Sequence, residues 1–253
     1  RQLKKMKLLY ATNLEGQALS SSLIETILAL RHVGLEEIVF LQTTPFDGWL
    51  ENLSGLGIKY RILVEEALSL PRILSVAGKE DVSLLVVNLD RKIHNPSHGS
   101  LIRGLIKRSS VPVLVLNDTS TRDEELFEHI IFPTNWSPAS EKSLTRLLDF
   151  SVIIKRLDIV NVINGKLTVK DIRKLKQELV QTRKMCLDKK IDAESHIYAG
   201  RIVEEIITAS EDYRATLIVL GASPKKPFYK EMFRRNSSCR VAEEAAVPVL
   251  VVP

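Results

Sequence analysis

The sequence has few cysteines and no long hydrophobic run. Its two cysteines, Cys186 and Cys239, are too few for a disulfide scaffold and are typical of a reducing compartment, so we expect a cytoplasmic protein. No apolar stretch reaches the ~18–20 residues that a membrane-spanning helix needs. The segment Arg1 to Lys7 is basic but lacks the apolar core of a signal peptide. These absences exclude a disulfide miniprotein, and we expect no membrane partner.

The net charge of the chain is also small, because acidic and basic residues nearly balance. The 253 residues include 36 Lys and Arg against 31 Asp and Glu, which gives a net charge of +5, and 45% of the residues are hydrophobic. This composition is typical of a folded globular protein and excludes an intrinsically disordered chain.

Residues 167–190 account for the whole excess of positive charge, because basic residues outnumber acidic ones nine to three between Lys166 and Lys190. Apolar residues at helical spacing predict a long amphipathic helix here, with Ile172, Leu175, Leu179 and Cys186 on its apolar stripe. No aromatic residues alternate with the basic ones, so a solvated outer face is favoured over a nucleic-acid surface. A regulator that binds nucleic acid through this helix stays an alternative.

Three segments of the first half recur in the same order in the second half. The pairs are 7–13 with 129–135, 82–88 with 215–221, and 111–116 with 247–252. Ordered recurrence of this kind indicates a duplicated domain. We therefore predict one domain over 1–118, a polar linker over 119–127 and a second domain over 128–253.

Four short runs are apolar without interruption: Leu84–Val87, Val113–Leu116, Leu217–Leu220 and Val249–Val252. A strand that is apolar on both faces is covered on both faces, which is typical of a parallel sheet between two layers of helices. Helical patterns lie between these runs, and Ser137-Pro138 has the chemistry of an N-cap followed by the first helical residue. Each half is therefore predicted to be an α/β unit of about five strands with right-handed crossovers.

Three features resemble the universal stress protein family in its tandem two-domain form. A short strand ends in Thr12-Asn13 and again in Thr134-Asn135, where the family has Pro-Thr-Asp or Pro-Val-Asp. The fourth strand of each half leads into the loop in which the family has the pattern Gly-x2-Gly-x9-Gly-Ser/Thr. The ending Ser238 to Val252 looks like the family's typical ending. The resemblance covers essentially the whole chain.

The resemblance implies the fold of the adenine nucleotide alpha hydrolase type, with strand order 3-2-1-4-5 in each half. It also implies a pseudo-two-fold axis between the halves, with the two final strands pairing at the sheet edges. Since the fusion supplies the interface that a single-domain relative obtains by dimerising, we expect a monomeric chain. The implied function is that of a stress-response module with no required cofactor. The module either binds AMP, ADP or ATP weakly or acts as a scaffold for a protein partner.

In family members that hold ATP, an aspartate after the first strand contacts the nucleoside, and glycines let backbone N–H groups approach the phosphates. Carried over to this sequence, the first-half site consists of Ala11, Thr12, Asn13, Asn88, Arg91, Gly99 and Ser100. The second-half site consists of Pro133, Thr134, Asn135, Gly221, Asn236 and Ser237. Neither half has the full pattern, because asparagine replaces the aspartate in both and Pro224 replaces a glycine in the second.

The first half is the preferred site. Gly99-Ser100 is expected to begin a helix, whose free N–H groups and positive end attract phosphate, and Arg91 adds a charge-assisted contact. In the second half, Pro224 and Arg234-Arg235 crowd the path of the phosphates. The alternative, in which neither half binds a nucleotide, stays open.

Motifs for catalysis are absent at any recognisable spacing. The sequence shows no catalytic triad, Walker loop or acid–base pair of carboxylates, so we expect no enzyme. A slow ATPase that uses a loop Arg or Lys is the alternative.

Histidines four residues apart, His94 and His98, could hold a metal ion if they lay on a helix. Asn95-Pro96 lies between them and favours a loop. We therefore interpret both histidines as exposed loop residues; a contact with phosphate is the second interpretation and a metal site the third. The other histidines are interpreted as structural: His32, His129 and His196. We expect no metal, and we interpret Cys239 as a small packing residue.

Overall fold

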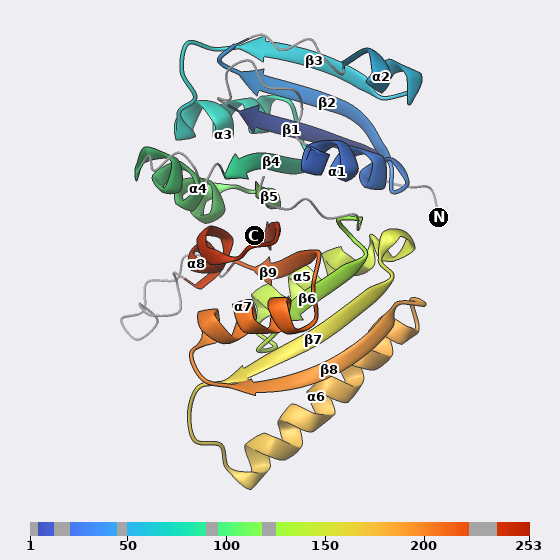
Figure 1. Ribbon diagram of the computed structural model, residues 1–253, viewed down its shortest axis with the longest axis vertical. Coiled ribbons are helices and arrows are strands. Elements are labelled where there is room, and N and C mark those ends of the chain that lie inside the picture. The colour runs from blue at the N-terminus through green and yellow to red at the C-terminus, as the bar shows by residue number, and fades with distance from the viewer. Residues whose placement is uncertain (1–4, 13–20, 45–49, 90–95, 118–124, 223–236) are drawn as a thin grey trace. The chain divides into compact units, whose positions relative to one another are not determined.

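The computed structural model of the chain describes residues 5–12, 21–44, 50–89, 96–117, 125–222 and 237–253 (Figure 1). The chain divides into two compact units, Arg1–Asp123 and Glu124–Pro253. Each unit contains five parallel strands with helices on both faces.

The first unit alternates strands and helices along the chain. Its elements are β1 (Met6–Thr12), α1 (Ser21–Arg31), β2 (Leu35–Gln42), α2 (Leu50–Gly55), β3 (Lys59–Val64), α3 (Leu70–Lys79), β4 (Leu84–Leu89), α4 (Pro96–Arg108) and β5 (Val113–Asn117). The strands lie in the order β3-β2-β1-β4-β5, and every neighbouring pair is parallel.

The second unit repeats this succession. Its elements are β6 (His129–Pro133), α5 (Pro138–Leu148), a 3-10 turn (Ser151–Ile153), β7 (Arg156–Ile163), α6 (Val169–Leu187), β8 (Asp192–Ala199), α7 (Ile202–Asp212), β9 (Leu217–Gly221), α8 (Ser237–Glu244) and β10 (Val249–Val252). The order β8-β7-β6-β9-β10 is again 3-2-1-4-5, with all pairs parallel. The predicted fold class is confirmed in both units.

Right-handed crossovers decide which face each helix covers. In the second unit, α5 and α6 connect strands that run outward toward β8, whereas α7 and α8 connect strands that run back toward β10. The two pairs therefore lie on opposite faces, α6 against β8 and β7, and α7 against β7 and β6 (Figure 1).

The burial of the strands follows from this layering. Central strands are buried on both faces, as in β9, where Leu217, Ile218 and Val219 have no exposed surface. The outer strand β8 is instead mostly exposed, with only Ala193 buried, because helices cover it incompletely. The four uninterrupted apolar runs are the buried strands β4, β5, β9 and β10, as predicted.

Local helix signals are mostly confirmed. Ser137 is the N-cap of α5, where its hydroxyl accepts a bond from the backbone of Ser140, and Pro138 is the first helical residue. The basic amphipathic helix is α6, which begins at a capping box between Thr168 and Asp171.

The predicted apolar stripe of α6 is wrong at one residue, Ile172. Leu175, Leu179 and Cys186 are buried, but Ile172 is 42% exposed. In Figure 1, α6 diverges from β8 toward its own start, so its first turns have little sheet beneath them.

No helix among the described residues is both long enough and apolar enough to cross a membrane.

Candidate ligand site at the carboxyl ends of the strands

The strand order reverses at one place in each unit, and the predicted site residues gather there. In the first unit, β1 lies between β2 and β4, and Ala11 pairs with Val87. The next residues of the two strands, Thr12 and Asn88, therefore lie side by side at the carboxyl edge. Ligands of open α/β sheets bind at this kind of switch point.

The second unit has the equivalent switch point between β6 and β9. Ile131 pairs with Ile218, and the two strands end at Pro133 and Gly221. Thr134 is buried, and its N–H donates to the carbonyl of Val160 at 2.8 Å, so the end of β6 is held against β7. Pro133 and Thr134 at the end of β6 and Gly221 at the end of β9 therefore lie at the same edge of the sheet.

Three predicted residues, Asn13, Arg91 and Asn236, lie outside the described part of the chain. Of the others in the first unit, Ala11 and Asn88 are buried. Thr12 is half-buried at the edge of the sheet, and Ser100 is exposed.

The expectation that Gly99-Ser100 begins the closing helix is wrong. Helix α4 begins at Pro96, since proline has the backbone angle and the missing N–H that suit a first helical position. Gly99 and Ser100 therefore fall after the first three helical residues, where N–H groups already have acceptors within the helix. His98 lies in the first turn of α4 and not in a loop, while His94 lies outside the described residues.

In the second unit, the polar groups at the switch point are engaged in starting α5. The side-chain oxygen of Asn135 accepts bonds from the backbone N–H of Ser137 at 3.1 Å and from the hydroxyl of Ser140 at 3.4 Å. The backbone carbonyl of Thr134 accepts a bond from the side chain of Asn161 at 2.8 Å. Asn135 itself is exposed, and its amino group takes no part in these bonds.

Trp136, which the sequence analysis did not single out, fixes the loop after β6. Its φ is 51°, in the left-handed region that is unfavourable for a bulky side chain. Two bonds hold it there: its backbone N–H donates to the Thr134 hydroxyl at 3.1 Å, and its indole N–H donates to the Thr182 hydroxyl at 3.0 Å. The loop is therefore tied to α6.

Gly221 is required by packing inside the unit. A Cβ atom at this position would lie 2.4 Å from the carbonyl oxygen of Ala139 and 2.9 Å from the nitrogen of Ser140, both backbone atoms of α5. The missing side chain lets the first turn of α5 approach β9. The resemblance implies that a glycine here lets phosphate come close. In this structure, helix α5 fills that space beside Gly221.

A second polar cluster, which the sequence analysis missed, lies on the face of the second sheet that α7 covers. The carboxylate of Asp158 is fully buried and lies 2.6 Å from His129 Nε2 and 3.1 Å from His196 Nε2. His196 also contacts the hydroxyl of Tyr213 through Nδ1 at 3.0 Å, and their rings stack. The sequence analysis interprets both histidines as structural; the structure shows that they converge on one carboxylate.

The environment of Asp158 favours its charged form. Burial by itself raises the pKa of this carboxyl, but hydrogen bonds from His129 and His196 and the nearby charge of Arg156 outweigh burial and hold the pKa below its usual range. One signal could have revealed this residue: an aspartate inside an apolar strand segment must find partners.

Comparison with known proteins gives one family. The family model described as the universal stress protein family matches residues 126–253. No curated protein matches the chain.

Solved structures resemble the whole chain. A universal stress protein from Archaeoglobus fulgidus has a TM-score of 0.67 at 19% identity, over 97% of this chain and 95% of that one. A putative universal stress protein from Pseudomonas aeruginosa UCBPP-PA14 has a TM-score of 0.69 at 13% identity, over 98% and 93%. A functionally unknown protein from P. aeruginosa PAO1 has a TM-score of 0.68 at 13% identity, over 98% and 92%. At these identities the likeness shows a shared fold.

Proposed function

Because the chain belongs to the universal stress protein family, we propose that it is a stress-response protein that binds an adenine nucleotide weakly and catalyses no reaction. The observation that carries this proposal is the meeting of Ala11, Thr12 and Asn88 at the switch point between β1 and β4. Helix α4 follows β4, so its positive end is available to a phosphate near the same edge.

The first unit is the preferred site, because helix α5 already fills the space beside Gly221 in the second unit. In the second unit, the side-chain oxygen of Asn135 accepts the N–H of Ser137, the Thr134 hydroxyl accepts the Trp136 N–H, and Gly221 packs against α5. A ligand there would have to displace bonds that the fold already uses. Each displaced bond costs affinity, because a buried polar group left unpaired is unfavourable.

We propose that the protein acts in the cytoplasm. A protein partner there would distinguish its nucleotide-bound form from its nucleotide-free form. Neither cysteine forms a disulfide and both are buried, which agrees with a reducing compartment.

The repeat offers a matched pair of variants for the test. Thr12 and Thr134 are equivalent residues of the two units, so Thr12→Val and Thr134→Val make the same chemical change at the two switch points. Titration calorimetry with AMP, ADP and ATP on the full chain would measure both. We expect Thr12→Val to weaken binding about 5-fold, the equivalent of one lost hydrogen bond, and Thr134→Val to leave the affinity unchanged.

Three results would count against the proposal. Absence of binding by the wild-type chain would favour a pure scaffold. A loss confined to Thr134→Val would move the site to the second unit. Release of phosphate from ATP above that of a mock-purified control would favour the slow ATPase.

A further inference from the structure

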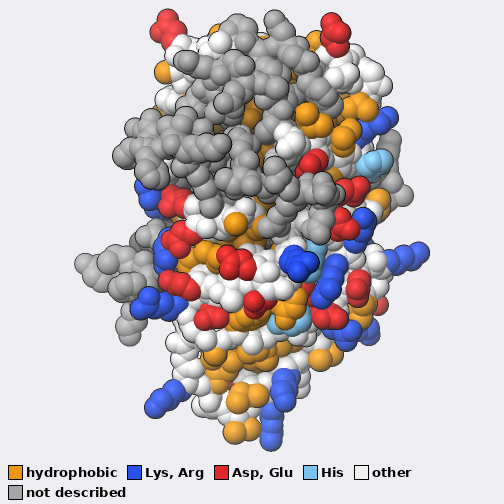
Figure 2. Space-filling model, in the orientation of Figure 1, with side chains coloured by type: hydrophobic (Ala, Val, Ile, Leu, Met, Phe, Trp, Pro, Cys, Tyr) orange, Lys and Arg blue, Asp and Glu red, His pale blue; other side chains and the backbone are white. Residues whose placement is uncertain are grey.

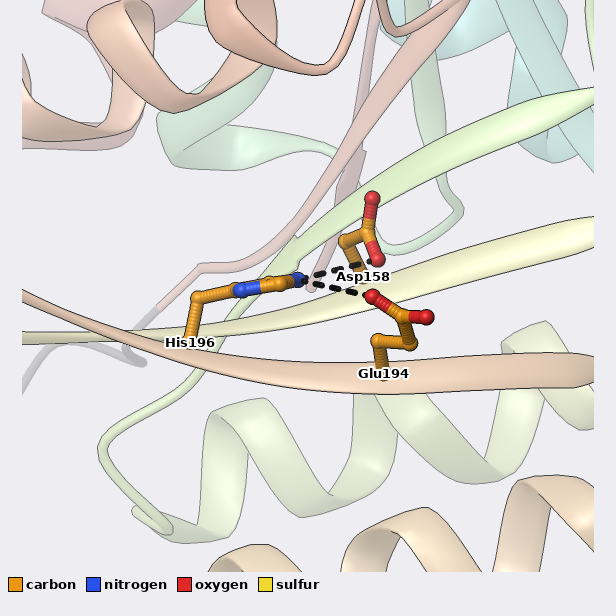
Figure 3. Close-up of side chains that lie close together, drawn as sticks. All are labelled: Asp158, Glu194 and His196. Atoms are coloured by element: carbon orange, nitrogen blue, oxygen red, sulfur yellow. Dashed lines mark hydrogen bonds and ion pairs between the residues drawn. The ribbon is translucent and has the colours of Figure 1, made fainter.

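Three metal-ligating side chains meet on adjacent strands of the second unit. Asp158 of β7 pairs in register with Glu194 of β8, and Val160 pairs with His196. Since alternate residues of a strand share a face, Asp158, Glu194 and His196 all point to the same side of the sheet (Figure 3). Their ligand atoms lie within 4.8 Å of one another.

We propose that Asp158, Glu194 and His196 form a binding site for a divalent transition-metal ion of the zinc type. His196 Nε2 lies 3.1 Å from Asp158 Oδ1 and 3.9 Å from Glu194 Oε2. Ligand atoms around a tetrahedral zinc ion are about 3.4 Å apart, given bonds of about 2.0–2.2 Å. Small side-chain movements would therefore bring the three atoms to ligand distance.

The types of donor atom select the ion. One imidazole nitrogen with two carboxylate oxygens suits Zn²⁺ and its neighbours Co²⁺ and Ni²⁺, whereas Mg²⁺ and Ca²⁺ prefer oxygen alone. Three protein ligands would leave a fourth position for water. The Glu194 side chain is 53% exposed, so an ion could enter from solvent. Figure 2 shows histidine side chains beside acidic and basic ones on this face of the surface.

Neighbouring groups already hold two of the ligands in place. Tyr213 bonds Nδ1 of His196 at 3.0 Å and stacks on its ring at a centroid distance of 4.3 Å, which leaves Nε2 facing the carboxylates. His129 Nε2 lies 2.6 Å from Oδ2 of Asp158, on the oxygen that faces away from His196. Partners of this kind orient ligands at metal sites.

One cation competes with the ion. Arg156 Nη2 lies 3.5 Å from Asp158 Oδ1 and 3.5 Å from Glu194 Oε2. Its Nε atom is buried without a hydrogen-bond partner among the described residues, and the side chain is 39% exposed. The guanidinium is therefore held incompletely and can move into solvent when an ion displaces it.

The first unit has Val39, Arg61 and Leu63 where the second unit has the three proposed ligands. The repeat aligns Lys7 with His129, and Lys7 pairs with Glu37 at 3.2 Å and with Glu80 at 2.8 Å. Arg61 contacts the same two carboxylates. Ammonium and guanidinium groups donate hydrogen bonds but do not bind metal ions, so we assign the site to the second unit alone.

The test is a titration of the chelator-treated full chain with Zn²⁺, followed by calorimetry, and with Co²⁺, followed by its visible absorption. We expect one ion per chain. His196→Ala should lower the Zn²⁺ affinity at least about 100-fold, and Tyr213→Phe, which removes a supporting partner, about 10-fold. Arg156→Gln should raise the affinity about 10-fold, because it removes the competing charge. His32→Ala, at an exposed histidine after α1, is the matched control and should change nothing.

Arg156→Gln separates a metal site from a salt-bridge network. It should strengthen Zn²⁺ binding at a metal site, whereas it would only weaken a salt-bridge network. If His196→Ala fails to fold, Glu194→Gln at an exposed position takes its place and should also lower the affinity. Absence of Zn²⁺ binding, or equal affinity in wild type, Glu194→Gln and Arg156→Gln, would overturn the proposal.

Discussion

The carbonyl oxygen of Ala139 lies 2.4 Å from the position that a Cβ atom on Gly221 would occupy. Both partners are backbone in regular elements, the start of α5 and the end of β9, so neither can move without separating the helix from the sheet. We expect Gly221→Ala to reduce the free energy of unfolding by about 1–3 kcal/mol, as overpacking does. Urea denaturation followed by circular dichroism would measure it.

Gly78→Ala is the matched control for that change. Gly78 lies in α3, where a Cβ atom would meet nothing within 4 Å. Alanine is the better helix former by about 1 kcal/mol, so this variant should be as stable as wild type or more stable. A Gly221→Ala chain of unchanged stability would show that α5 and β9 are less closely packed than described.

A second prediction concerns the charge of Asp158. Asp158→Asn removes the carboxylate that bonds His129 and His196 while keeping the size of the side chain. We expect a loss of about 3 kcal/mol at pH 7, because the group is buried and its partners lose a charged acceptor. Glu36→Gln, in the exposed ion pair with Lys5, is the control and should cost less than about 1 kcal/mol.

The sign of the pH dependence follows from the lowered pKa of Asp158. Its unfolded value is about 3.9, so its stabilisation is fully present above that pH and is lost as the pH falls through the lower folded-state pKa. Below about pH 4, the wild-type chain should therefore lose stability more steeply than Asp158→Asn. Parallel stability curves for the two chains from pH 6 downward would contradict this assignment.

The third prediction concerns the thiols. Cys186 has no exposed surface, and burial raises its pKa to about 11; Cys239 is 2% exposed. Since the thiolate is the reactive form, we expect neither cysteine of the folded chain to react with a thiol reagent at pH 8, and both to react in denaturant. Rapid reaction of one thiol under native conditions would show local opening around it.

Much of the fold could be predicted because its signals are local. Leu217 to Leu220 is apolar without interruption because both faces of β9 are covered, and Ser137-Pro138 starts α5 through chemistry within four residues. The failures lie where a distant element decides. The exposure of Ile172 depends on how closely the first turns of α6 lie against the sheet, which helical spacing does not encode.

The candidate sites show the same division. Thr12 and Asn88 could be placed together because strand order alone brings the ends of β1 and β4 side by side. The cluster around Asp158 could not, because His129 and His196 come from strands 29 and 38 residues away and meet it only through the register. Each histidine taken alone is typical of an ordinary strand residue.

The final prediction ranks the two switch points. Gly99 lies near the start of α4, whose positive end follows the switch point of the first unit. A branched side chain there would crowd a phosphate bound at that end, so we expect Gly99→Val to lower the affinity for AMP, ADP and ATP at least about 10-fold, equivalent to about 1.4 kcal/mol. Gly165→Val is the control, because a Cβ atom at that exposed position meets nothing within 4 Å. Titration calorimetry on both variants gives the comparison. Unchanged affinity in Gly99→Val would place the nucleotide in the second unit, and equal losses in both variants would mean that the change acts through stability.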